Sequence, residues 1–245
     1  MIFKLKKIKK GDIVARNSYD RDILFRVKKI IKIDKNITVI LTGLTERIEA
    51  DSPIEDLEIV ERDTIKRYVE LMDKKLNERV RGIENANKNK KGDRNVFERS
   101  RVKQKILTGR ILHLDGDRRY ADKSYTYYKK LGLNAIVKNI AEYKQPKSIY
   151  NLLKMYKPDI LVITGHDGMI KKGQKYNDLY NYRNSKHFIN AVKEARRYDI
   201  ENRANLVIFA GACQSYFEAL ISAGANFASS PGRILIDFLD PLIVA

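Results

Sequence analysis

Two short apolar runs, each closed by glycine and a polar side chain, constrain the fold of this chain most. Residues 159–168 read DILVITGHDG, and residues 205–213 read NLVIFAGAC. Both runs are short and rich in β-branched or aromatic residues, so each is predicted to be a buried strand. Buried strands that alternate with helices form a mainly parallel sheet with helices on both faces. We therefore expect an α/β fold over residues 106–245.

The other segments after residue 106 follow the same alternation. GRILHLDGD, residues 109–117, is predicted to be a strand that ends in an acidic loop, and Asn134–Ile140 is predicted to be a second strand. Helices are expected at 119–131, at Ser148–Tyr156, at Asn184–Arg197 and from after Cys213 through Ala223. Two further short segments are expected at Phe227–Ser230 and Ile234–Leu239.

Residues 1–60 have a different pattern, with four or five short β-rich stretches separated by polar breaks such as residues 34–36. Strands this short and this close together predict a small SH3-like β-barrel. Residues 61–81 carry apolar side chains three and four positions apart, which predicts a helix. Residues 82–95 are nearly free of apolar side chains and predict a flexible basic linker. We expect three parts: 1–60, 61–105 and 106–245.

Composition limits the possible functions. The formal net charge is +18, which suits a protein that binds nucleic acid through the basic barrel, and we keep this as an alternative hypothesis. No apolar run approaches the roughly 18 residues of a membrane helix. The N-terminus, MIFKLKKIKKGD, lacks the apolar run and cleavage site of a signal peptide, so we expect cytoplasmic synthesis and no membrane partner. The single cysteine, Cys213, excludes an intrachain disulfide and a cysteine zinc site.

Polar side chains follow three of the predicted strands. HLDGD ends at Asp117, GHDG ends at Gly168, and GACQS contains Cys213. In an open parallel sheet, such strand ends converge at one edge, where ligands bind. His166 and Cys213 are therefore expected to meet. A thiolate that attacks a carbonyl, a histidine that transfers the proton, and backbone N–H groups that hold the oxyanion make up a cysteine peptidase.

The spacing of the two residues agrees with this chemistry. Cys213 follows His166 by 47 residues, and in caspases an Ala-Cys dipeptide follows its histidine by roughly 50. We predict a caspase-like peptidase domain with Cys213 as nucleophile and His166 as its partner. The N–H groups of Gly168 and Cys213 are the predicted oxyanion donors, with Asp167 as the alternative to Gly168. A helix beginning after Cys213 is expected to lower the pKa of the thiol. This mechanism needs no metal or organic cofactor.

Asp115 and Asp117 allow several interpretations. They could cap a helix, or they could form the centre of a metal- or phosphate-dependent hydrolase, which is a further alternative. Caspase-like enzymes often read the side chain before the cleaved bond, the P1 residue, from the loop after their first strand. An acid there would pair with a substrate arginine. We therefore predict that Asp115 or Asp117 binds the P1 side chain.

A closer resemblance covers the chain from about residue 10 to residue 243. It is carried by ILHLDGD, DILVITGHDG, NDLYNYRNSKHFINAVKEAR, LVIFAGACQSYFEALISAGANFASSPGRI and GDIVARNSYDRDILFRV. These segments resemble the YabG-type sporulation peptidases of endospore-forming bacteria. The resemblance implies a cysteine peptidase, with the catalytic pair on His166 and Cys213. It also implies cleavage after basic residues, chiefly arginine, in spore-coat and germination proteins, and association with the spore coat.

Two further expectations follow from the resemblance and from the charge pattern. Family members commonly continue beyond the point where this chain stops, at LDPLIVA, so a final strand or helix is expected to be missing. The Lys/Arg-rich stretch 82–105 would be cut readily by a protease that cleaves after basic residues. Self-cleavage in this stretch is therefore a hypothesis.

Overall fold

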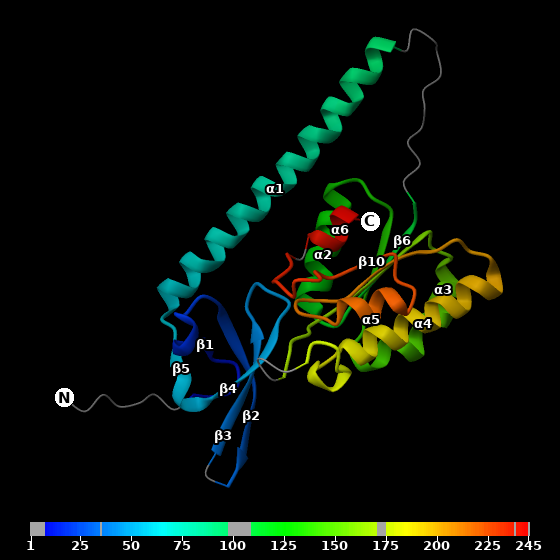
Figure 1. Ribbon diagram of the computed structural model, residues 1–245. Helices are drawn as coiled ribbons and strands as arrows, with labels where there is room; N and C mark the ends of the chain where they lie inside the picture. The colour runs from blue at the N-terminus through cyan, green and yellow to red at the C-terminus, as the bar shows by residue number, and fades with distance from the viewer. Residues whose placement is uncertain (1–7, 35, 98–108, 171–174, 238, 245) are drawn as a thin grey trace. The chain divides into compact units, whose positions relative to one another are not determined.

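The computed structural model describes residues 8–34, 36–97, 109–170, 175–237 and 239–244. The chain forms two compact units. The first contains residues 1–60 together with residues 109–245, and the second contains residues 61–108. The first unit holds a parallel sheet with helices and an antiparallel sheet (Figure 1). The predicted α/β class is therefore confirmed.

The parallel sheet has the strand order β10-β9-β8-β6-β7. Its strands are β6 (Ile111–Asp115), β7 (Ala135–Asn139), β8 (Ile160–Thr164), β9 (Val207–Ala210) and β10 (Phe227–Ala228). The chain runs from β6 to β7 on one side and then crosses back to β8 on the other side of β6. This reversal between β6 and β8 is the topological switch point, where open α/β sheets place their binding crevices.

Helices cover both faces of the sheet, as predicted. They are α2 (Arg118–Lys130), α3 (Gln145–Tyr156), α4 (Ser185–Asn202), α5 (Phe217–Ser222) and α6 (Asp240–Val244). Helix α2 packs against β6 and β7, whereas α3 and α4 pack together and contact β6, β8 and β9 (Figure 1). Right-handed crossovers place α2 on the face opposite to α3 and α4. Leu112 and Leu161 point into the core beneath α3 and α4.

The antiparallel sheet has the order β4-β3-β2-β1-β5. Its strands are β1 (Ile13–Arg16), β2 (Leu24–Ile33), β3 (Asn36–Gly43), β4 (Glu49–Pro53) and β5 (Leu57–Ile59). Val14, Phe25 and Leu41 form its apolar core, and Cys213 and Ile236 of the α/β part belong to the same cluster. The loop that carries Cys213 is thus packed against the N-terminal sheet.

The second unit is built around α1 (Arg62–Phe97). This helix begins where the periodicity predicts but runs beyond residue 81, through the stretch in which apolar side chains stop recurring. The lysine and asparagine residues of that stretch are compatible with a helix, and each interior glycine costs about 1 kcal/mol of helix stability relative to alanine. Residues 82–95, predicted to be a flexible linker, are therefore helical, whereas residues 98–105, which end the second predicted part, lie outside the described residues.

Candidate active site

Three loops at the switch point carry the predicted site residues. Asp115 is the last residue of β6 and lies opposite Thr164, the last residue of β8. His166 follows β8 by two residues, and Cys213 follows β9 by three. Parallel pairing of β6, β8 and β9 brings the three strand ends to one edge of the sheet. The structure thus collects at one edge the segments that the sequence singles out.

Asp115 is fully buried and pairs with a side chain from the N-terminal sheet. Its Oδ2 lies 2.8 Å from Nη2 of Arg47 and accepts a hydrogen bond from the Thr164 hydroxyl at 2.9 Å. Burial would raise the pKa of Asp115, but the Arg47 guanidinium and the hydrogen bond from His113 hold it well below its usual value. Asp115 is therefore a carboxylate that carries its charge in the interior because a guanidinium faces it.

Arg47 comes from the loop between β3 and β4, and its side chain has no exposed surface. Its guanidinium carbon lies 5.0 Å from the centre of the Tyr120 ring. Among the described residues, Nε and Nη1 of Arg47 have no hydrogen-bond partner. Asp115 therefore supplies the charged contact, and the aromatic ring supplies a face on which the guanidinium packs. This pocket holds the arginine side chain of Arg47.

His166 is nearly buried beside the same pocket. Its ring meets the Tyr120 ring edge-on, with centroids 5.6 Å apart, and its Nε2 lies 3.9 Å from Oδ2 of Asp117. Among the described residues, Nε2 has no hydrogen-bond partner. Burial lowers the pKa of His166, partly offset by the carboxylates of Asp117 and Asp115. The imidazole is thus neutral near pH 7, with one nitrogen available for proton transfer.

Glu142 holds the backbone of His166 in place, and the sequence analysis did not identify it. Its Oε1 accepts a hydrogen bond from the His166 N–H at 2.9 Å. A Cβ atom at Gly116 or Gly165 would lie 2.1 or 2.5 Å from Oε1 of Glu142, so both glycines leave the space that this carboxyl fills. Glu142 follows the end of β7 by three residues, and this position after a strand end is the sequence feature that could have identified it.

Cys213 is fully buried, and its thiol contacts the backbone of the C-terminal segment. The N–H of Ile236 points to Sγ at 3.4 Å, and Sγ lies 3.5 Å from the Ile236 carbonyl oxygen. Burial raises the pKa of Cys213 to about 11, although backbone hydrogen bonds from Ile236 and Arg47 oppose the shift. The expected lowering by a helix is wrong because α5 begins only at Phe217. In this arrangement Cys213 is a protonated thiol.

The backbone on either side of Arg47 runs alongside the loop that carries His166. The Arg47 carbonyl oxygen accepts a hydrogen bond from the Asp167 N–H at 3.4 Å, and the Glu49 N–H donates to the Asp167 carbonyl at 3.0 Å. Ile48 thereby pairs with Asp167 in a parallel bridge. The Gly168 N–H, one of the predicted oxyanion donors, instead donates to Oδ1 of Asp167 at 2.9 Å.

Gly168 is required by this close approach. A Cβ atom there would lie 2.1 Å from the carbonyl oxygen of Glu49, a backbone atom that cannot rotate away. We therefore expect Gly168→Ala to push the 47–49 segment aside and to cost about 1–3 kcal/mol of stability, as overpacking usually does. Thermal unfolding of Gly168→Ala beside Gly232→Ala, whose Cβ would meet only ordinary contacts from 3.6 Å, checks this. Equal midpoints would contradict it.

The Asp167 carboxyl group joins the histidine loop to the cysteine loop. It is fully buried and accepts four hydrogen bonds. Oδ1 accepts from the N–H groups of Gly168 (2.9 Å) and Asn184 (2.8 Å). Oδ2 accepts from the hydroxyls of Ser185 (2.5 Å) and Ser215 (2.9 Å). Ser215 in turn accepts from the Ala212 N–H, next to Cys213. Asp167, the alternative oxyanion donor of the sequence analysis, is thus the centre of a hydrogen-bond network.

Asp167→Ala is expected to destabilise the protein by about 2–4 kcal/mol, because buried donors lose their acceptor. Burial raises the pKa of Asp167 to about 6, against hydrogen bonds led by that of Ser185. The raised pKa means that this site stabilises the fold most at low pH and loses that contribution as pH rises toward 6 and above. Asp167→Asn should remove this pH dependence. Denaturant unfolding from pH 4 to pH 8 measures both effects, and identical pH profiles would contradict the assignment.

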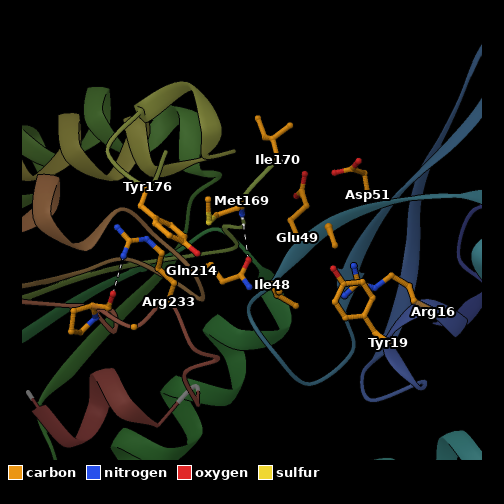
Figure 2. A pocket seen from close by; sticks show the side chains of 13 residues that line it. Arg16, Tyr19, Ile48, Glu49, Asp51, Met169, Ile170, Tyr176, Gln214 and Arg233 are labelled. Carbon is orange, nitrogen blue, oxygen red and sulfur yellow. Dashed lines mark hydrogen bonds between the residues drawn. The ribbon is translucent and has the colours of Figure 1, made fainter. Parts of the chain in front are cut away.

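An open cleft of about 590 Å³ begins at Ile48 and follows β4. Figure 2 shows Glu49 and Asp51 on one side, and Met169, Gln214 and Arg233 on the other. The Met169 N–H donates to Oε1 of Gln214 at 3.4 Å, which joins the loop after His166 to the residue after Cys213. The cleft is therefore continuous with the segment that contains the catalytic candidates.

The structure thus brings His166, Asp117 and Asp115 together, and Arg47 contacts the loops of both His166 and Cys213. Asp117 also caps α2 by accepting from the Arg119 N–H at 2.7 Å, the capping role that was one interpretation of its position. Sequence reasoning did not find Arg47, because this residue lies in a loop between two strands of the other sheet and outside any motif.

Comparison with known proteins now decides the family. The family model described as YabG peptidase U57 matches residues 9–245. The chain belongs to the YabG peptidase family. It is 42% identical, over 239 residues, to the sporulation-specific protease YabG of Bacillus subtilis (strain 168), an alignment that covers 96% of this chain and 82% of that protein. No solved structure matches the chain significantly. The resemblance read from the sequence is confirmed, and the YabG match supports a protease that acts in sporulation.

Within the ranges given above, no helix is both long and apolar enough to span a membrane. The same residues contain no group of three or more His, Cys, Asp or Glu side chains arranged to hold a metal ion. Asp115, at the centre of the alternative hydrolase hypothesis, faces the guanidinium of Arg47.

Proposed function

We propose that this YabG family member is a cysteine endopeptidase that cleaves after arginine. Cys213 is the nucleophile, His166 transfers the proton, and Asp115 binds the guanidinium of the P1 residue. One observation carries the proposal: a buried arginine side chain pairs with Asp115 at 2.8 Å while its carbonyl oxygen contacts the N–H of the residue after His166. A P1 arginine of a substrate would make the same two contacts.

The backbone geometry favours Asp167 over Gly168 as the oxyanion donor on the histidine loop. The Asp167 N–H points to a carbonyl oxygen, whereas the Gly168 N–H is engaged by the Asp167 side chain. We propose the N–H groups of Asp167 and Cys213 as the pair that stabilises the tetrahedral intermediate. Gly168 then has the separate task of allowing the backbone at Glu49 to approach.

The reaction follows from these positions. His166, neutral because it is buried, accepts the Cys213 proton, and the thiolate attacks the carbonyl carbon of the P1 arginine. The oxyanion is held by backbone N–H groups while His166 returns the proton to the leaving amine. Water then hydrolyses the thioester. The Asp115 carboxylate selects arginine because an uncharged side chain would leave a buried charge unpaired.

The biological setting comes from the family. We propose that the chain acts in sporulating cells on spore-coat and germination proteins and associates with the spore coat. A caspase-like parallel sheet and an SH3-like N-terminal barrel are parts of the same proposal. The sheet order with its switch point between β6 and β8 supports the first, and the five-stranded antiparallel sheet supports the second.

A set of matched peptides tests the proposed activity. Fluorogenic peptides that differ only at P1, with arginine, lysine or citrulline, would be incubated with the intact chain and with Arg47→Ala, in which the pocket is vacated. We expect hydrolysis of the arginine peptide and at least a hundredfold preference over citrulline, the uncharged isostere. An arginyl chloromethylketone should attach to Cys213 of Arg47→Ala, as seen by mass spectrometry. Equal rates on arginine and citrulline, or labelling elsewhere, would contradict the proposal.

A further inference from the structure

We propose that the loop Leu44–Ile48 is a substrate built into the chain, and that Cys213 cleaves the Arg47–Ile48 bond of its own molecule to open the active site. This inference rests on the proposed function. It goes beyond it by naming the first bond cleaved, and by assigning the intact chain to a closed precursor.

The side chain of Arg47 fills the pocket that a substrate arginine needs. It is fully buried, pairs with Asp115 and packs on Tyr120. A surface loop rarely inserts an arginine into the interior, because burying a charge is costly unless it is paired. A pocket that binds arginine for catalysis provides that pairing in advance. The position of Arg47 is thus explained if the loop occupies a site made for P1.

The backbone of the loop lies as a substrate backbone should. The Arg47 carbonyl oxygen accepts a hydrogen bond from the Asp167 N–H at 3.4 Å, and Ile48 belongs to the same buried cluster as Cys213. The peptide bond after Arg47 therefore lies beside the histidine loop and leads into the buried cluster that contains the nucleophile. Ile48 and Glu49 then continue along the Asp167 backbone and into the cleft of Figure 2, where residues after a cleaved bond would lie.

The same contacts keep other substrates out. Cys213 has no exposed surface, and His166 is 5% exposed. A second arginine cannot reach Asp115 while Arg47 pairs with it. Burial also keeps Cys213 protonated, with a pKa of about 11, so the thiol of the intact chain is poorly reactive toward external reagents. The intact chain is consequently closed to external substrates until the loop leaves.

Cleavage would open the site without disrupting the antiparallel sheet. The loop links β3, which ends at Gly43, to β4, which begins at Glu49, and these strands pair from Thr38 and Pro53 to Thr42 and Glu49. After the cut, residues 44–47 become a four-residue tail that is free to leave the pocket. The two fragments stay together because β3, β4 and the apolar core between the strands are unchanged.

The chemical step balances without any further reagent. Sγ of Cys213 bonds to the Arg47 carbonyl carbon, the bond from that carbon to the Ile48 nitrogen breaks, and His166 protonates the new amine. Water hydrolyses the thioester and leaves a carboxylate on Arg47. The sequence suggested self-cleavage within 82–105, part of which lies outside the described residues, whereas the structure points to Arg47.

The experiment follows the freshly purified full chain by intact mass and N-terminal sequencing. We expect fragments 1–47 and 48–245, a new N-terminus at Ile48, and a first-order rate that does not change over a hundredfold range of protein concentration. The fragments should co-elute in native buffer and separate in denaturant. Arg47→Lys should slow the cut at least tenfold, and Cys213→Ala and Arg47→Ala should remain single chains. Arg197→Ala, which changes an exposed arginine on α4, should be cut like the parent.

Peptide hydrolysis separates failure of this inference from failure of the proposed function. We expect the parent to hydrolyse the arginine peptide after a lag that matches the cut, and Arg47→Ala to hydrolyse it without a lag. If both hydrolyse it at equal rates from the start and no Ile48 terminus forms, the built-in substrate is overturned while the peptidase stands. A cut whose rate rises with concentration would overturn its intramolecular origin. If neither protein hydrolyses the peptide, the proposed function itself is wrong.

Discussion

Cys213→Ala is expected to lower kcat/KM for an arginine peptide by at least about 10³-fold, because the covalent step then has no nucleophile. His166→Ala should lose a comparable factor, because no group then accepts the thiol proton and none protonates the leaving amine. The double variant should be little worse than either single one, as residues that act as one unit are not additive. All rates are best compared in the Arg47→Ala background, so that access to the site is equal.

Matched variants distinguish a loss of catalysis from a loss of folding. Cys213→Ser keeps the size of the side chain and should preserve the fold while still losing most activity, because a serine at this position has no strong base. Asn202→Ala, at the far end of α4 from the site, should leave kcat/KM within twofold of the parent. If Cys213→Ala retained more than a tenth of the parent activity, the cysteine mechanism would be excluded, and a water-activating carboxyl group would have to be sought.

The fold was predictable where buried strands carry their own signature. ILVIT and VIFA are read as strands because they are short, apolar and β-branched, and their alternation with helices was enough to predict a mainly parallel sheet. The end of α1 was less predictable, because lysine and asparagine neither extend an apolar stripe nor stop a helix. The start of α5 was predicted too early. Gln214 takes a left-handed φ of 59°, so the helix begins only at Phe217.

The site was predictable only in the parts that strand ends bring together. Asp115, His166 and Cys213 follow neighbouring strands β6, β8 and β9, so the placing of their three loops at one edge of the sheet follows from topology alone. The contribution of Arg47 depends on how the loop between two strands of another sheet meets those ends, and no local spacing encodes that contact. Asp167 was visible as an alternative oxyanion donor, but two of its four hydrogen bonds come from Ser185 and Ser215, which lie in distant segments.

Asp115→Asn is expected to lower kcat/KM for the arginine peptide by about 10²–10³-fold while changing that for the citrulline peptide less than threefold. Asparagine preserves the shape, and its carbonyl oxygen can still accept the Thr164 hydroxyl, but a charged partner for the guanidinium is lost. Hydrogen bonds to charged groups contribute about 1.5–3 kcal/mol, and the unpaired guanidinium adds its desolvation cost. The comparison again belongs in the Arg47→Ala background.

Asp117→Asn distinguishes between the two acids that the sequence offered. Asp117 caps α2 and lies 3.9 Å from His166, with its side chain partly exposed. Its change should therefore alter the rate on both peptides to a similar extent and leave their ratio intact. A collapse of the arginine-to-citrulline ratio in Asp117→Asn, with Asp115→Asn unchanged, would move the P1 contact to Asp117. Arg47 would then pair with Asp115 only to anchor its loop.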